Sequence, residues 1–258
     1  MKSIPLIIQF IGTMVIVILS IWFGSQVGRI LQRRKKNEKE GTISVISGSI
    51  LGLLAFILAF TFGIVSDRYD ARKGLIREEA NQIGAVWLRS EFMPEPDRST
   101  TRRLLKQYLG LRIQLLESID NARVEKSLAE ATKIQDQLWS LAARHSTTDM
   151  QTDVAALYFE ALNNLIDTQA LRVAVAYQGH IPPGLWMSLY ALLVLGMITV
   201  GYHARIIESN MNFGVLILAF SFSLVIWIIS NFDELQSKYF QISQQPFTDL
   251  QAKIVNQL

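Results

Sequence analysis

Residues 42–92 read TISVISGSILGLLAFILAFTFGIVSDRYDARKGLIREEANQIGAVWLRSEF, and this stretch decides how the chain folds. Its first part, residues 42–65, is apolar and long enough to cross a bilayer as a helix. Charged residues follow from Ser66 onward, and no proline or turn cluster interrupts the pattern. The stretch therefore predicts one long helix, half in lipid and half in water, on which the other segments assemble.

Small residues recur along one side of this predicted helix. At a turn of about 100° per residue they fall within a sector of about 100°, and the line becomes polar beyond the apolar part. Small side chains let another backbone approach closely inside a bilayer. The line consists of Gly48, Gly52, Ala55, Ala59, Gly63, Ser66, Asp70, Gly74, Arg77, Asn81 and Gly84.

The apolar half of this line has three interpretations, which stay open. Its small residues can pack against another span of the same subunit, or they can make a dimer contact. Alternatively, they face the axis of an oligomer, where Phe56, Phe60 and Phe62 border a constriction that gates by dewetting. The candidate pore or helix-packing residues are Gly48, Gly52, Ala55, Phe56, Ala59, Phe60 and Gly63.

The composition is typical of a membrane protein with a sizeable water-exposed part. Of the 258 residues, 50% are hydrophobic and 18% are charged, and the mean hydropathy is +0.26. The net charge of +3 is too small to indicate nucleic-acid binding. Because the chain has no cysteine, disulfides, thiolate metal sites and cysteine nucleophiles are excluded.

The rest of the chain predicts three further spans and a set of water-exposed helices. The N-terminal apolar run is too long for a typical signal peptide, so we interpret it as a retained span. Pro94 and Pro96 end the long helix. The predicted fold is all-α: an integral membrane protein with four transmembrane helices and a helical water-exposed domain inserted between spans two and three. The predicted segments are a transmembrane hairpin over residues 1–65 (spans 6–28 and 42–65), a helical soluble domain over residues 66–181 (with further helices near 100–118, 123–144 and 149–177), a second hairpin over residues 182–230 (spans 185–202 and 211–230), and a polar tail over residues 231–258 with a helix near 247–256.

The side of the membrane that holds the helical domain stays open. The cluster Arg33-Arg34-Lys35-Lys36 follows span one, and by the positive-inside rule it favours an extracytoplasmic domain. Arg68, Arg72, Lys73 and Arg77 follow span two and favour the opposite orientation.

Charged residues cluster just beyond span two. They predict a solvated helix surface whose charges pair with one another. Alternatively, Arg68, Arg72 or Arg77 forms a basic ring that concentrates anions at a pore mouth, or Asp70 gives the vestibule a mixed charge. The candidate vestibule residues are Asp67, Arg68, Asp70, Arg72, Arg77 and Asn81.

No motif in the chain predicts an enzyme. His145, His180 and His203 are scattered along the sequence, so we do not expect them to bind a metal. There is no phosphate-binding glycine-rich loop, nucleophile elbow or metalloprotease motif. The spans carry almost no ionisable side chains, which proton-coupled transporters usually need. We therefore expect no catalytic residues, no cofactor and no metal, and either a passive pore or a plain membrane anchor.

Several runs of sequence are specific enough to compare with a known family. LAFTF (residues 58–62) is followed by DRYDAR (67–72), and EEANQIG (78–84) is followed by WLR (87–89). Near the end, ISQQPF (242–247) matches a tail motif of the Val-Ser-Gln-Gln-Pro-Leu type. Together these runs resemble the bestrophin-like bacterial membrane proteins, whose shared domain has no assigned function.

One run departs from the family pattern. The family usually has an Asp-Leu-Asp-Arg-Pro type run after span four, whereas residues 231–235 here read NFDEL and keep only the second aspartate. Gln244 and Gln245 can dock the tail by bonding backbone of the helical domain, or they can touch a ligand or a lipid headgroup. The family-motif residues of the tail are Asp233, Ser243, Gln244, Gln245 and Pro246.

The resemblance implies a layout and a function as expectations. Bestrophins are oligomeric anion channels with four spans per subunit, a long second helix near the channel axis and a helical cytosolic part. We therefore expect a multi-pass protein of the bacterial inner membrane that forms a homo-oligomeric, passive ion channel for a small anion. The alternative is a non-conducting, membrane-anchored helical scaffold or sensor. The expected partners are the lipid bilayer, further copies of the chain and a small anion, and no nucleic acid.

Overall fold

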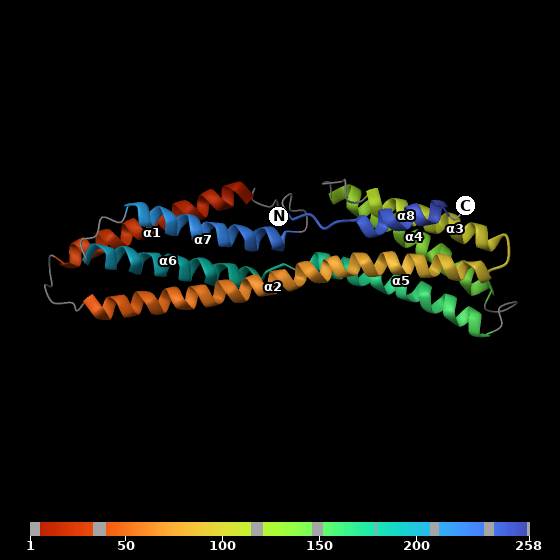
Figure 1. The fold of residues 1–258 in the computed structure, drawn as a ribbon, viewed down its shortest axis with the longest axis horizontal. Helices are drawn as coiled ribbons and strands as arrows, with labels where there is room; N and C mark the ends of the chain where they lie inside the picture. Colours follow the sequence, from red (N-terminus) through yellow and green to blue (C-terminus); the bar gives the residue numbers. More distant parts are fainter. Residues whose placement is uncertain are drawn as a thin grey trace. The chain divides into compact units, whose positions relative to one another are not determined.

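The computed structural model describes residues 6–32, 40–114, 121–145, 152–178, 180–206, 212–234 and 240–256. Within these ranges the chain forms helices and no strand, as predicted (Figure 1). The helices are α1 (Leu6–Gln32), α2 (Glu40–Arg89), α3 (Asp97–Gln114), α4 (Asn121–His145), α5 (Thr152–Gln178), α6 (Pro183–Ile206), α7 (Asn212–Asp233) and α8 (Gln245–Asn256). Of these, α1, α2, α6 and α7 are long and apolar enough to cross a membrane, so the structure has four candidate spans, as many as the sequence predicts.

Helix α2 is the single long helix that the opening stretch predicts. It continues from apolar into charged sequence without a break and ends at Arg89, followed by a short 3₁₀ turn over Ser90–Phe92. The prolines at 94 and 96 follow, and since the residue before a proline disfavours helical backbone, the next helix starts only at Asp97. The continuity of α2 is therefore confirmed, and its end lies within three residues of the prediction.

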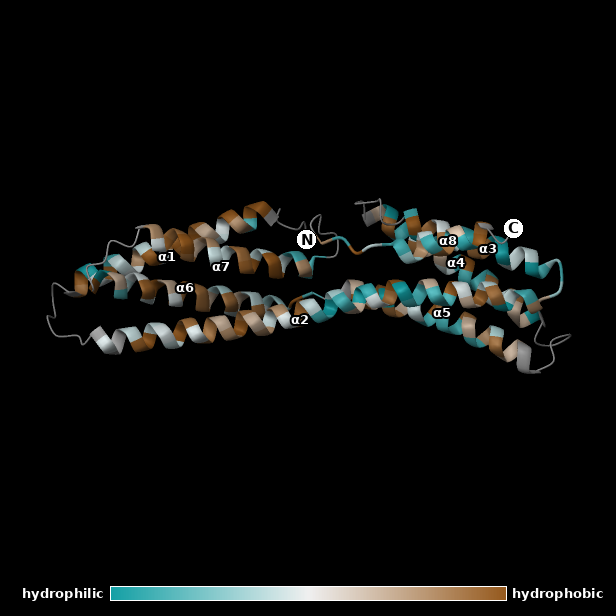
Figure 2. Cartoon of the chain, in the orientation of Figure 1, coloured by the Kyte–Doolittle hydropathy of each residue, from teal (hydrophilic) through white to brown (hydrophobic). Residues whose placement is uncertain are grey.

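The chain divides into two compact units, to both of which α2 contributes. The first, here called the span unit, consists of Met1–Tyr69 and His180–Phe240, and the second, here called the helical unit, consists of Asp70–Gly179 and Gln241–Leu258. Hydrophobic residues predominate on α1, α6, α7 and the first half of α2, whereas hydrophilic residues are frequent on α3, α4, α5 and α8 (Figure 2). The core of the span unit includes Val17, Ile21, Leu54, Leu58, Leu189, Leu193, Met197, Ala219, Ile226 and Ile229.

Helices α1 and α6 of the span unit cross closely through glycines. A Cβ atom placed on Gly24 would overlap the carbonyl oxygen of Ile198, and one placed on Gly201 would overlap the carbonyl oxygen of Ile21. A Cβ atom placed on Gly28, one turn after Gly24, would lie 3.1–3.3 Å from the side chains of Arg205 and Tyr202 on α6. Glycine spaced in this way lets two backbones touch in lipid, where the hydrophobic effect does not drive helices together.

The helical unit has a core of its own, formed by α3, α4, α5, α8 and the second half of α2. Its fully buried members include Ile83, Leu105, Leu138, Leu162, Leu165 and Phe247. Helix α8 belongs to this core because the side chains of Phe247 and Ile254 are buried in it. The last part of the chain, expected to be a polar tail, is therefore amphipathic and packs into the helical unit through its apolar side.

Candidate functional site

The small-residue line on α2 is open in the single chain. Gly48, Gly52, Ala55 and Ala59 are exposed, and Gly63 is half-exposed. A Cβ atom placed on Gly48, Gly52 or Gly63 would meet nothing within 4 Å. The described residues therefore do not supply the same-chain partner that one interpretation of this line required. The glycines that do make such a contact lie on α1 and α6, where the sequence did not lead us to expect them.

The three phenylalanines proposed for a constriction lie on different sides of α2. Phe56 and Phe60 are one turn apart and exposed, at 65% and 59% of their full surface. Phe62 instead packs edge-on against Phe232 of α7, with ring centroids 5.8 Å apart. Phe62 is also 40% exposed and lines a groove with Ala55 and Ala59, so it differs from Phe56 and Phe60 by its ring contact with Phe232.

The polar continuation of α2 separates into exposed and inward-facing residues. Asp67, Asp70, Arg77 and Asn81 are exposed, and a Cβ atom placed on Gly74 between them would meet nothing within 4 Å. Arg68 lies 3.9 Å from the carboxylate of Asp233, and Arg72 is buried at 8% exposure. Of the three arginines considered for a basic ring, only Arg77 is exposed, and it shares the exposed surface with Asp70.

Asp233 connects three segments of the span unit. Its Oδ1 accepts a hydrogen bond from the backbone N–H of Ile181 at 2.9 Å, and the same oxygen lies 3.9 Å from Nη1 of Arg68. Nδ1 of His180 lies 3.9 Å from the other carboxylate oxygen. The aspartate that the family motif keeps therefore ties the end of α7 to α2 and to the residues that lead into α6.

Replacing Asp233 should separate its hydrogen-bonding role from its charge. Asp233→Ala leaves the N–H of the buried Ile181 without its acceptor, and we expect a loss of about 1–3 kcal/mol of stability. Asp233→Asn keeps an acceptor oxygen and should lose less. Thermal unfolding of the full chain in detergent measures both variants. An equal loss in the two would show that the charge next to Arg68 matters and that the hydrogen bond does not.

The Gln-Gln-Pro run begins α8. The backbone N–H of Gln245 donates to Oγ of Ser243 at 3.3 Å, and Pro246 occupies the first turn, where its missing N–H is not needed. The side-chain nitrogen of Gln244 donates to the carbonyl of Ile242 at 3.3 Å. These hydrogen bonds of the two glutamines are local, whereas Phe247 and Ile254 hold the tail to the helical unit.

A buried polar cluster lies in the core of the helical unit, and sequence analysis missed it. Its members come from α2, α3, α4 and α5, and they are Glu79, Tyr108, Arg112, Gln135, Gln169 and Arg172. Glu79 belongs to the EEANQIG run, and the sequence predicted a solvated charged surface there, which is wrong for this residue. A signal was present, because Glu79 is spaced three and four residues from Ile76 and Ile83, both of which are buried.

The carboxylate of Glu79 is the centre of this cluster. Oε1 accepts from the hydroxyl of Tyr108 at 2.6 Å and from Nε of Arg112 at 2.7 Å, and Oε2 lies 2.7 Å from Nη1 of Arg172. Nη2 of Arg112 donates to the Tyr108 hydroxyl at 2.9 Å. Glu79 and Arg112 have no exposed side-chain surface. Because a low dielectric strengthens such bonds, the cluster holds α2, α3 and α5 in one arrangement.

Burial and the neighbouring groups change the pKa values of three side chains in the cluster. It raises the pKa of the Tyr108 hydroxyl well above its ordinary value, so this group stays neutral. Burial acts to lower the pKa of Arg112, but the neighbouring oxygens of Tyr108 and Glu79 outweigh it and raise the pKa. Burial lowers the pKa of Arg172, and Glu79 opposes the change. Both guanidiniums keep their charge, since arginine does not lose its proton in proteins.

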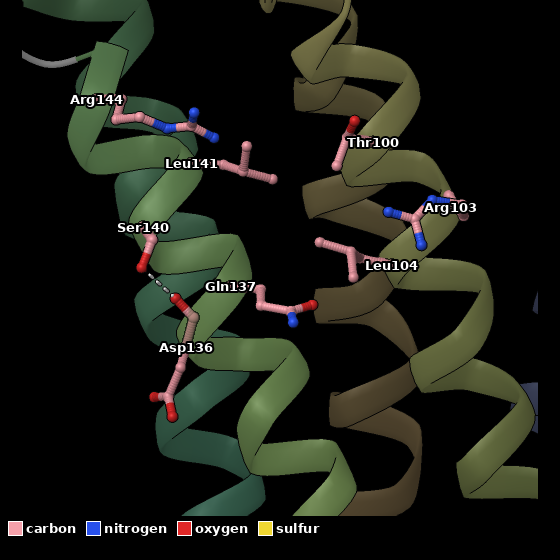
Figure 3. Close-up of a pocket in the computed structure, with 8 residues that line it drawn as sticks. All are labelled: Thr100, Arg103, Leu104, Asp136, Gln137, Ser140, Leu141 and Arg144. Carbon is pink, nitrogen blue, oxygen red and sulfur yellow. Dashed lines mark hydrogen bonds between the residues drawn. The ribbon is translucent and has the colours of Figure 1, made fainter.

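An open groove of about 390 Å³ lies between α3 and α4 on the surface of the helical unit (Figure 3). Arg103 lies on its α3 side and Arg144 on its α4 side, and the hydroxyl of Ser140 donates to the carbonyl of Asp136 at 2.8 Å. The serine hydroxyl is thus used within its own helix. Within the described residues no group of three or more histidines and carboxylates could hold a metal.

Comparison with known proteins identifies one family and several structures of the same fold. A family model described as the Bestrophin-like domain matches residues 11–247. A mutant of a bacterial bestrophin homologue from Klebsiella pneumoniae has 11% sequence identity, covers 98% of this chain and 100% of its own, and gives a TM-score of 0.63. A second mutant of that homologue has 12% identity, covers 97% of each chain and gives a TM-score of 0.62. No curated protein matches the chain.

Proposed function

The chain belongs to the bestrophin-like family, whose domain covers residues 11–247, and we propose on this basis that copies of it assemble in the membrane into a passive ion channel. Membership in this family supports a channel-type role. The similarity to solved structures, at 11–12% identity, supports the fold. In this proposal, individual residues of α2 and its neighbours hold the copies together, line the pore and select the ion.

The open line of small residues on α2 is the observation that carries this proposal. Gly24 and Gly201 contact another helix of the same chain, whereas Gly48, Gly52 and Gly63 have no neighbour within 4 Å of their Cβ positions among the described residues. In a homo-oligomer we place this open face of α2 towards the shared axis. There its small side chains leave space for a pore instead of packing against a backbone.

An apolar groove beside the line fits the same arrangement. It has a volume of about 430 Å³ and lies between α2 and α7, and Ala55 and Ala59 of the line belong to its wall. The remaining lining residues are Leu58, Phe62, Ser221, Phe222, Val225 and Ile228. A groove of this size next to small residues gives an apolar side chain of a neighbouring subunit a place to pack.

Phe56 and Phe60 then border the narrowest part of the pore. Both are exposed on the side of α2 that carries the small residues. A ring of such side chains around an axis forms a hydrophobic constriction, which conducts only when it is wetted. Residues 41–65 contain no ionisable side chain, so this segment offers no proton relay and fits passive flux.

Anion conduction is the finer part of the proposal. It is supported by the family resemblance and by Arg77, the exposed arginine of the polar part of α2. Asp70 lies on the same exposed surface and repels anions, so the preference of the pore for anions or cations depends on the opposing effects of Arg77 and Asp70.

We also propose that the helical unit lies in water, because its surface is rich in charged residues, and that the membrane is the bacterial inner membrane.

Gly52→Leu tests the pore. Because nothing lies within 4 Å of the Cβ position, the substitution should leave the folding of the single chain intact. In liposomes that carry the purified protein, we expect halide flux to fall to background while the assembly keeps its mass. The reason is that the added isobutyl group of each subunit narrows the axis. Stopped-flow halide flux and the oligomer mass in detergent are measured together.

Gly12→Leu is the matched control, since Gly12 lies on α1 and also has nothing within 4 Å of its Cβ position. It should keep wild-type flux. Undiminished flux in Gly52→Leu would remove the small-residue line from the pore. A wild-type assembly that is folded and inserted but passes no halide, with and without calcium, would instead favour the non-conducting scaffold.

A further inference from the structure

The buried cluster of the helical unit carries more positive than negative charge. Glu79 brings one negative charge, and Arg112 and Arg172 bring two positive charges to it, each at 2.7 Å from a carboxylate oxygen. The other members, Tyr108 and two glutamines, are neutral. Among the described residues, Glu79 is the only carboxylate that forms an ion pair with either arginine.

An unbalanced charge at this depth is costly. Removing a guanidinium from water is costly even after relaxation, and the attraction to a partner offsets this cost only when the geometry is good and the remaining N–H groups are hydrogen-bonded. A lysine or histidine can lose its proton in this situation, but arginine cannot. The cluster is therefore short of one negative charge that its own side chains do not provide.

One nitrogen of the cluster also lacks a hydrogen-bond partner. Arg112 donates through Nε to Glu79 and through Nη2 to the Tyr108 hydroxyl. Its third nitrogen, Nη1, is buried and has no acceptor among the residues that the structure describes. The missing acceptor thus belongs to the more deeply buried of the two guanidiniums that share the single carboxylate of Glu79.

We propose that Nη1 of Arg112 binds a small inorganic anion of halide size, which balances the charge of the buried cluster. The burial of Arg112 limits the size of the anion, because its side chain has no exposed surface. Of the two arginines in the cluster, only Arg172 reaches solvent, with 16% of its side chain exposed. Phosphorylated ligands and peptide carboxylates are too large to reach a fully buried nitrogen. The site is a static one in the core of the helical unit, and it does not depend on the proposed pore.

A halide titration of thermal stability tests the site. The full-length protein in detergent is heated in gluconate buffer with increasing chloride or bromide at constant ionic strength. Because the anion binds the folded state only, the melting temperature should rise by a few degrees and then saturate. Arg112→Gln leaves one arginine for one carboxylate, so its melting temperature should not respond to halide.

Arg103→Gln is the matched control, because it removes an exposed arginine from the same helix. It should respond to halide as the wild type does. An equal response in Arg112→Gln and in the wild type, or no response in the wild type, would overturn the proposal.

Bromide soaking of wild-type crystals gives a second test that needs no variant. An anomalous peak at hydrogen-bonding distance from Nη1 of Arg112 is the expected result. A peak only at surface positions would show adventitious ions only and would overturn the site. Both tests are independent of flux, so their failure and the failure of the channel proposal are distinguishable.

Discussion

Replacing Gly24 or Gly201 by alanine is expected to prevent α1 and α6 from packing as they do. A single Cβ atom at either position would overlap a backbone carbonyl oxygen of the facing helix, at Ile198 or Ile21. Backbone cannot move aside as a flexible side chain can, so the helices must separate along the whole crossing. We expect a loss above about 3 kcal/mol, at the upper end of the cost of overpacking.

The yield of monodisperse protein in detergent and its melting temperature measure this effect. Gly12→Ala is the control, since it adds the same methyl group to the same helix as Gly24→Ala at a position with nothing within 4 Å. It should leave both quantities unchanged. If Gly24→Ala and Gly12→Ala behaved alike, the close crossing of α1 and α6 would be wrong.

Glu79→Gln should have an effect of similar size in the helical unit. The substitution preserves the shape of the side chain but removes the only carboxylate that pairs with Arg112 and Arg172 in the described structure. Two guanidiniums are then buried without a counter-charge, and breaking a buried pair from one side costs about 3–5 kcal/mol. Limited proteolysis of the full chain should show earlier cleavage within residues 70–179.

Glu78→Gln is the matched control for this variant. Glu78 is the preceding residue of α2, is exposed and accepts a hydrogen bond from Gln82 at the surface. Loss of its charge should change stability by less than about 0.5 kcal/mol. Wild-type resistance of Glu79→Gln to protease would show that the buried cluster does not stabilise the unit, and the charge imbalance at Arg112 would then have no energetic consequence.

The spans and the long helix could be predicted because their signals are local. Apolar length alone indicates a span, and the uninterrupted passage of residues 42–89 from apolar to charged sequence indicates one continuous helix. The prolines at 94 and 96 likewise place the next helix start to within a few residues. Each of these features depends on neighbours in the sequence, so no knowledge of distant residues was needed.

The contacts of the small-residue line could be predicted only in part from local sequence. Periodicity placed Gly48, Gly52 and Ala55 on one side of α2, and they do lie on an open side of it. Periodicity does not show that Gly24 of α1 and Gly201 of α6 form a close helix contact within the chain, because that contact joins residues far apart in the sequence.

The sequence by itself determined the helices, the four apolar spans and the family. Hydrogen bonds of a helix are local, and apolar length measures a bilayer directly. Only the tertiary structure decided that Glu79 is a buried ion-pair centre while Glu78 beside it is exposed, and that Phe247 anchors the tail. A charge becomes buried or solvated according to what packs around it, and the partners of Glu79 come from helices that folding alone brings together.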